Sequence, residues 1–190
     1  MHKPRGFTLI ELLVAIAIAA ILIMLAAPSF KQLIQSNTMS SNVNSFLADM
    51  RYARSEAIRR GGGVIMCRSN LPETAPSCDG ASGPDGNGWV SGWVIYVDQN
   101  SNGAIESTEL LRVQAPITSI NSIVETKASP TGEFRFTATG RLLNLSSATS
   151  LRFGDNPKFA NNVQRVVCVS VGGRARIAGD GNASCGSSNE

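Results

Sequence analysis

An apolar stretch near the start of the chain predicts its first element. From Phe7 to Ala27 the sequence FTLIELLVAIAIAAILIMLAA contains only two polar residues, Thr8 and Glu11. As an α-helix this stretch would be about 32 Å long, enough to cross the hydrocarbon core of a bilayer. No later stretch is as apolar, so the pattern predicts one membrane anchor followed by a soluble body.

Beyond Pro28 the pattern becomes amphipathic. Apolar residues recur at three- and four-residue spacings, which places them on one face of a helix. Pro28 is expected to kink this helix without ending it, and the run Gly61–Gly63 is expected to end it. Anchor and continuation would together form one helix of about 54 residues, roughly 80 Å long. The core-facing stripe is Val43, Phe46, Leu47, Met50, Ala53 and Ala57.

After the three glycines the pattern predicts short strands separated by Gly, Pro, Asn and Ser clusters. A long helix with these strands predicts an α+β fold, in which the helix packs on an antiparallel sheet. The expected strands are 64–68, 89–97, 109–114, 133–137, 150–153, 163–170 and 174–177.

Charge is unevenly distributed along this body. Residues 61–133 hold three basic and eight acidic side chains, a net charge of −5, whereas residues 134–178 hold seven basic and one acidic, a net charge of +6. Such asymmetry indicates either a face that binds a polyanion or a solvated basic surface.

Four cysteines indicate disulfides and exclude a zinc site. No two of them form a CxxC pair, and the single histidine, His2, cannot complete a ligand set. An even count suits two disulfides in an oxidising compartment. Of three possible pairings we favour Cys67–Cys78 and Cys168–Cys185, because each closes a short loop, which would contribute about 3 kcal/mol.

The junction between the basic leader MHKPRG and the apolar run carries a specific motif. GFTLIELLVAIAIAAIL resembles the prepilin motif of type IV pilins and type II secretion pseudopilins. The resemblance implies cleavage after Gly6 by a prepilin peptidase and methylation of the new amino group of Phe7. It also implies an anchor in the bacterial inner membrane with the head in the periplasm, and a pilus or pseudopilus after assembly.

Glu11 lies inside the apolar run, where a carboxylate is costly and usually has a partner. In pilins that partner is the amino terminus of a neighbouring subunit, so the resemblance implies an assembly role for Glu11. A shallow position near the lipid headgroups would also explain the residue and is compatible with that role.

A narrower resemblance covers the helix end and the central hairpin. The strings RYARSEAIRRGGGVIMC and GWVSGWVIYVDQNSNG are similar to the GspH/FimT/FimU group of pilins. The expected organisation is a leader at 1–6, a transmembrane and assembly helix at 7–28, its amphipathic continuation at 29–62 and an extracytoplasmic β-rich head at 63–190. The expected fold is the type IV pilin fold.

The segment from Asp98 to Glu109 fits the calcium-loop pattern D-x-[DN]-x-[DN]-G-x5-E. An EF-hand needs helices on both sides of the loop, whereas strand-like runs flank this one. Asn-Gly between two β-rich runs is typical of a hairpin, so we favour a hairpin turn and expect no metal. We also find no catalytic constellation and expect no cofactor, because the chain after the leader lacks histidine and no nucleophile lies near a base.

The C-terminal sequence Gly173-Arg174-Ala175-Arg176 carries the remaining chemistry. Two arginines separated by one residue in a strand share a face about 7 Å apart, comparable with the step between successive phosphates. The element is similar to a G-R-x-R element of FimT-type minor pilins. This resemblance implies DNA binding during natural transformation. Alternatively, the arginines protect a strand edge from aggregation. Further candidate phosphate contacts are Arg165, Lys158 and Arg152.

These patterns predict a non-enzymatic minor pilin whose partners are other pilins, prepilin peptidase and DNA. Two alternatives remain open: a structural pilin that primes pilus assembly, and an H-class pseudopilin for protein secretion.

Overall fold

The computed structural model describes residues 6–126 and 132–186, except the side chains of residues 25–29. The chain divides into two compact units, Met1–Asn37 and Thr38–Glu190. One helix, α1 (Leu9–Arg60), contributes to both. The helix continues through position 28, so Pro28 does not end it; the kink predicted there falls among residues 25–29, outside the described side chains.

In the first unit, large apolar side chains lie on the surface of α1. Phe7 is 89% exposed, and Leu9, Ile10, Ile18 and Leu22 are each more than half exposed. Within the part of the chain that the structure describes, no helix is both long and apolar enough to span a membrane.

The second unit buries the predicted stripe of α1. All six stripe residues are at most 4% exposed, and Met39 extends the stripe by one turn. The helix ends at Arg60, and Gly61, Gly62 and Gly63 all have positive φ, which side-chain-bearing residues rarely adopt. The amphipathic reading of this half of the helix is therefore confirmed.

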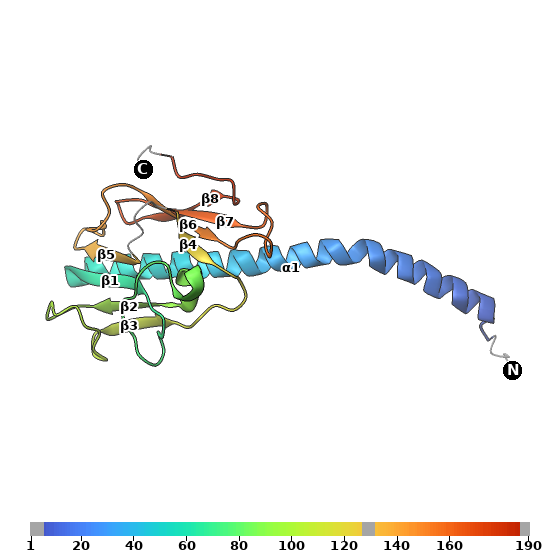
Figure 1. Ribbon diagram of the computed structural model, residues 1–190, viewed down its shortest axis with the longest axis horizontal. Coiled ribbons are helices and arrows are strands. Elements are labelled where there is room, and N and C mark those ends of the chain that lie inside the picture. The colour runs from blue at the N-terminus through green and yellow to red at the C-terminus, as the bar shows by residue number, and fades with distance from the viewer. Residues whose placement is uncertain (1–5, 127–131, 187–190) are drawn as a thin grey trace. The chain divides into compact units, whose positions relative to one another are not determined.

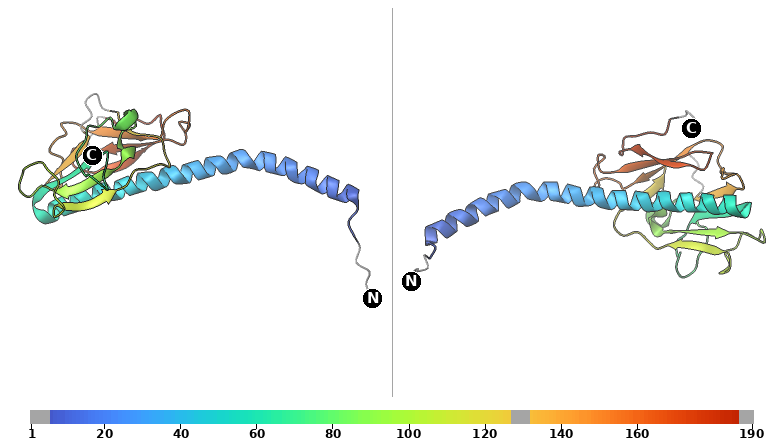
Figure 2. Two further views of the ribbon diagram at one scale, coloured as in Figure 1. Left: turned by 60° about the horizontal axis from the view of Figure 1, so that its bottom comes forward. Right: turned by 180° about the vertical axis from the view of Figure 1, so that it is seen from behind.

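Two four-stranded antiparallel sheets pack with this half of the helix. The first has the order β3-β2-β1-β5 and the second β4-β6-β7-β8. In Figure 1, β2 and β3 lie below the C-terminal half of α1 and β7 and β8 above it; the rear view in Figure 2 shows the same separation. The strands are β1 (Gly62–Arg68), β2 (Trp93–Val97), β3 (Leu110–Gln114), β4 (Ile123–Glu125), β5 (Glu133–Thr137), β6 (Thr149–Phe153), β7 (Arg165–Val169) and β8 (Ala175–Gly179).

One aromatic side chain of the helix joins the two sheets. The ring of Phe46 meets the rings of Trp93 on β2 and Phe153 on β6 edge-on, with centroids 5.4 and 5.5 Å apart. It also meets Trp89 and Phe134 at 5.8 and 6.5 Å. Edge-to-face pairs add to the free energy gained from burial, so this cluster holds both sheets to α1.

Two expectations were wrong: that of a single sheet and that of a strand over 89–97. Residues 89–91 form a 3-10 turn, because Gly88 and Gly92 flank it with φ of 67° and 105° and interrupt the extended backbone. A Cβ on Gly92 would lie 2.4 Å from the carbonyl oxygen of Gln114, so only glycine fits at this position. The short edge strand β4 was not predicted, since its three residues pair with β6 alone among the named strands.

Candidate functional site

The predicted processing site lies at the start of α1. Gly6 and Phe7 precede the helix and are exposed; the leader residues 1–5 are outside the described residues. The carboxylate of Glu11 accepts hydrogen bonds from the backbone N–H and the hydroxyl of Thr8, both at 3.0 Å. Within this chain the carboxylate of Glu11 thus caps its own helix, and its contact with another subunit remains a prediction.

The G-R-x-R element covers the end of the turn between β7 and β8 and the first two residues of β8. Ser170 and Arg174 close the turn: Ser170 N–H donates to the Arg174 carbonyl at 2.9 Å, and Gly173 N–H donates to the Ser170 carbonyl at 2.9 Å. The strand begins at Ala175, so Arg174 precedes β8, whereas we expected a strand over 174–177. Arg174 and Arg176 are both exposed, with the half-buried Ala175 between them.

This turn packs against a second basic turn, which follows β5 and carries Gly140 and Arg141. Leu142 N–H donates to the Val171 carbonyl at 2.9 Å, and a Cβ on Gly173 would lie 2.1 Å from the carbonyl oxygen of Gly140. Only glycine permits so close an approach, and Gly173 also has a φ of 73°. The contact brings Arg141 to the same region as Arg174, although the two lie far apart in the sequence.

The three arginines border one surface cavity of about 870 Å³. Its described lining contains no acidic side chain. None of the three guanidinium groups forms an ion pair or a hydrogen bond with the residues that the structure describes. Besides Arg141, Arg174 and Arg176, the lining includes Ser146, Ser147, Ser170, Gly172 and the Cys168–Cys185 disulfide.

The other predicted basic residues do not line this cavity. Arg165 donates from Nη1 to the carbonyls of Asn162, Val163 and Gln164, so its side chain stabilises the loop before β7. Lys158 lies over the ring of Phe159, 5.7 Å from its centroid, and Arg152 is half-buried on β6. Their contact with DNA remains a prediction. Arg141 was counted in the basic segment but not predicted as a site residue, since only the packing of Gly173 on Gly140 places it here.

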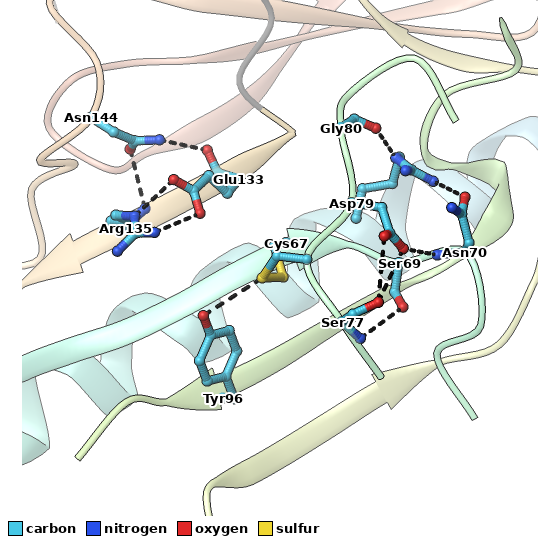
Figure 3. Close-up of a disulfide and its surroundings, with 12 residues drawn as sticks. Cys67, Ser69, Asn70, Ser77, Asp79, Gly80, Tyr96, Glu133, Arg135 and Asn144 are labelled. Carbon is cyan, nitrogen blue, oxygen red and sulfur yellow. Dashed lines mark hydrogen bonds and ion pairs between the residues drawn. A yellow bond between two sulfur atoms is a disulfide. The ribbon is translucent and has the colours of Figure 1, made fainter. Parts of the chain in front are cut away.

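The two disulfides occur in the favoured pairing. Cys67 on β1 bonds to Cys78 and Cys168 on β7 bonds to Cys185. Figure 3 shows the first of them beside Tyr96, whose hydroxyl lies 3.6 Å from the sulfur of Cys78. Burial raises the pKa of the Tyr96 phenol and keeps it neutral.

A buried arginine ends β1 in the same region. Arg68 is 2% exposed and donates to the Gly80 carbonyl, to the Asn70 side chain at 2.7 Å and to the Ser91 hydroxyl at 2.8 Å. Burial lowers the pKa of its guanidinium, which nevertheless stays charged. Because its donors are used inside the fold, Arg68 is structural and does not extend the basic surface.

The hairpin predicted at the calcium-like segment is confirmed. β2 and β3 pair antiparallel, with Tyr96 opposite Leu110, and Val97 N–H donates to the Glu109 carbonyl at 3.0 Å. Among the residues placed with certainty, no group of three or more His, Cys, Asp and Glu side chains is arranged to hold a metal ion.

Comparisons with known proteins agree with this architecture. Residues 42–173 match the family model described as type II transport protein GspH, and residues 1–27 match the prokaryotic N-terminal methylation motif. No curated protein sequence gives a significant match.

Two solved structures share the fold. Both are crystal structures of the type IV minor pilin FimU of Pseudomonas aeruginosa PAO1. The first has a TM-score of 0.57 at 20% identity over 77% of this chain and 95% of FimU; the second has 0.52 at 19% over 76% and 98%. The long N-terminal helix with antiparallel sheets is thus the type IV pilin fold. With its methylation motif and its match over most of the chain, the protein belongs to the GspH family of minor pilins and pseudopilins.

Proposed function

We propose that this minor pilin captures DNA for uptake in natural transformation, and that the DNA lies against the β7–β8 turn. The supporting observation is a group of three guanidinium groups, those of Arg141, Arg174 and Arg176, which have no partner among the described residues. They surround one cavity without an acidic residue in its described lining. Arginine binds phosphate through a planar fork of donors, and backbone phosphate contacts provide most of the affinity in sequence-independent binding.

The surroundings of these arginines suit a phosphate chain. Ser146, Ser147 and Ser170 add hydroxyl groups, and Gly172 leaves space for a close approach. Because the turn is fixed by backbone hydrogen bonds and by the Gly173–Gly140 contact, little order has to be gained on binding. A site with two to four such contacts would bind in the micromolar range or more weakly, so avidity along a fibre would matter.

Salt dependence gives the first test. The full chain in non-ionic detergent is titrated with labelled duplex DNA by fluorescence anisotropy at several salt concentrations. Three phosphate contacts predict that affinity falls about 40-fold between 50 and 200 mM salt. The variant Arg174→Gln/Arg176→Gln retains one contact, for which the same change of salt should weaken binding only about 4-fold.

A charge-matched variant provides the control. Arg59→Gln/Arg60→Gln removes the same charge from the last turn of α1, where both side chains pair with Glu56. This variant should keep the salt slope of the wild type. The DNA proposal fails if the wild type does not bind at low salt, or if both double variants bind equally well.

A structural role is the second candidate. The family match to a type II transport protein supports a pseudopilin for protein secretion, and a pilin that primes pilus assembly would share the same parts. In either case Arg174→Gln/Arg176→Gln would leave assembly unchanged, whereas substitution of Glu11 would impair it.

We further propose that residues 1–6 are a leader cleaved after Gly6, that Phe7 becomes methylated, and that residues 7–28 then anchor the chain in the bacterial inner membrane. The continuation at 29–62 and the head at 63–190 would lie in the periplasm before incorporation into a pilus or pseudopilus. The methylation motif and the exposed apolar surface of the first unit support this scheme. N-terminal sequencing should begin at methylated Phe7; a start near Ala27 would contradict it.

A further inference from the structure

The loop that joins β2 to β3 encloses a carboxylate. Asp98 follows β2, and its two oxygens accept the backbone N–H groups of Asn102 and Gly103, each at 3.2 Å. Ser101 and Gly103 have φ of 58° and 73°, so the chain winds tightly around Asp98. The Asp98 carboxylate is therefore held inside the turn.

A second carboxylate gathers the amide side chains of the loop. Oε1 of Glu106 accepts hydrogen bonds from the side-chain amides of Asn102 at 2.7 Å and Asn100 at 3.3 Å. The amide oxygens of both asparagines in turn accept backbone N–H groups within the loop. Three oxygen-bearing side chains therefore converge on one region.

Glu109 adds a buried carboxylate that the fold leaves incompletely satisfied. The residue is 4% exposed, and its Oε1 accepts the backbone N–H of Gln99 at 2.9 Å, which holds the group against the start of the loop. Its other oxygen is buried without a hydrogen-bond partner among the described residues, as is Oε2 of Glu106. A buried acceptor without a partner is costly, and more so when it is charged.

Glu106 and Glu109 lie one turn apart, since the backbone N–H of Glu109 donates to the Glu106 carbonyl at 3.0 Å. Each brings one buried oxygen to this loop. Neither group forms an ion pair with any residue that the structure describes. Two adjacent carboxylates repel unless a proton or a cation lies between them.

The loop is held against the sheet as well as by its own side chains. Ile105 packs on a small apolar cluster on the outer face of the first sheet, formed by Ile65, Cys67, Val94 and Tyr96. Glu109 follows directly into β3, and its carbonyl takes part in the hairpin ladder. The Glu109 carboxylate is thus fixed at the end of a paired hairpin.

We propose that the loop 98–109 binds a calcium ion through the side-chain oxygens of Asp98, Asn100, Asn102, Glu106 and Glu109. Calcium takes six to eight oxygen ligands, which include amide and backbone carbonyl oxygens as well as carboxylates. Acidic side chains alone do not form a metal cluster here, so the two asparagines are essential to the proposal. The order of residues follows the calcium-loop pattern, with strands in place of the helices of an EF-hand.

The alternative is a proton shared by Glu106 and Glu109, with no ion bound. Calcium would instead neutralise both groups and complete the contacts of the two unpartnered oxygens. It would therefore stabilise the head, whereas a shared proton makes the head indifferent to calcium.

The test measures binding and stability together. The full chain in non-ionic detergent is freed of metal with EGTA and titrated with CaCl2 by isothermal titration calorimetry. One site is expected, with a Kd of about 10⁻⁴ to 10⁻³ M, as in extracellular calcium modules. Calcium at about ten times Kd should raise the folded-to-unfolded ratio about elevenfold in urea. Fluorescence of the chain's two tryptophans, both buried in the head, reports this unfolding.

Two variants separate binding from folding. Glu109→Gln keeps an acceptor for Gln99 N–H and adds a donor toward Glu106, so in EGTA it should fold at least as well as the wild type. Its calcium affinity should fall at least about tenfold, because a charged ligand is lost.

If this variant does not fold, Asp98→Asn makes the same test. The control is Glu73→Gln, which changes an exposed acidic residue outside the loop. The proposal is overturned if 10 mM calcium produces neither heat nor stabilisation, if magnesium acts equally, or if Glu109→Gln or its substitute binds calcium as tightly as the wild type.

Discussion

Two hairpins of the head hold charge in opposite ways. In the β2–β3 hairpin, Asp98, Glu106 and Glu109 turn their carboxylates into the loop, where amides and backbone N–H groups surround them. In the β7–β8 hairpin, Arg174 and Arg176 are exposed, and their guanidinium groups make no polar contact with the described residues. Carboxylates that converge in one loop need a cation that fits between them. Arginines that are exposed on a rigid turn suit an extended anionic partner.

The two hairpin loops are also held in place by different contacts. The acidic loop is long, and its own side chains hold it together through the bonds around Asp98 and Glu106. The basic turn is short and relies on backbone contacts: Ser170 closes it, and Gly173 lies against Gly140. The acidic loop should therefore respond to ions, and the basic turn to changes in packing.

Matched glycine substitutions should give the largest difference between the hairpins. Gly173 and Gly103 both have a φ of 73°, but a Cβ would lie 2.1 Å from a backbone oxygen at Gly173 and meets nothing within 4 Å at Gly103. Gly103→Ala should cost only the left-handed penalty, about 1–2 kcal/mol. Gly173→Ala adds a clash with backbone and should cost more than about 3 kcal/mol.

Urea unfolding of both variants in EGTA, followed by tryptophan fluorescence, measures these costs. Because Gly173→Ala separates the turn from Gly140, it should also weaken DNA binding more than Gly103→Ala does. Equal losses of stability would mean that the contact between the two basic turns does not support the fold.

The sequence predicted those features that depend on local pattern. Helical spacing identified the buried stripe of Phe46 and its neighbours, and turn chemistry identified the β2–β3 hairpin. It did not predict the division into two sheets. It also missed β4, because this strand has three residues and is recognisable only from its pairing with β6. It also overextended β2 toward Trp89, since Gly92 was read as a strand residue.

For the candidate sites, the sequence supplied the residue types but not the neighbours. Arg174 and Arg176 were recognisable as a pair, whereas Arg141 joins them only through the approach of two glycines from separate turns. Likewise, the calcium-like pattern was visible from Asp98 to Glu109, and its strand flanks favoured a simple turn. The buried, unpartnered oxygens of Glu106 and Glu109 depend on how the loop folds onto the sheet, which no spacing rule describes.

The disulfides should distinguish the hairpins by function more than by stability. Cys67–Cys78 and Cys168–Cys185 close loops with sequence separations of 11 and 17, so replacement of either pair by alanine should cost about 3 kcal/mol. Only Cys168 and Cys185 line the cavity beside the arginines, where the bond ties the segment after β8 to β7. Loss of that pair should therefore weaken DNA binding, whereas loss of Cys67–Cys78, on the sheet that carries the acidic hairpin, should leave the DNA affinity unchanged.

Urea midpoints and anisotropy titrations of the two double variants make the comparison, after non-reducing peptide mapping has verified both pairs in the wild type. A Cys67–Cys168 link, or equal losses of DNA affinity, would show that the two hairpins are not independent in the way that their opposite charges suggest.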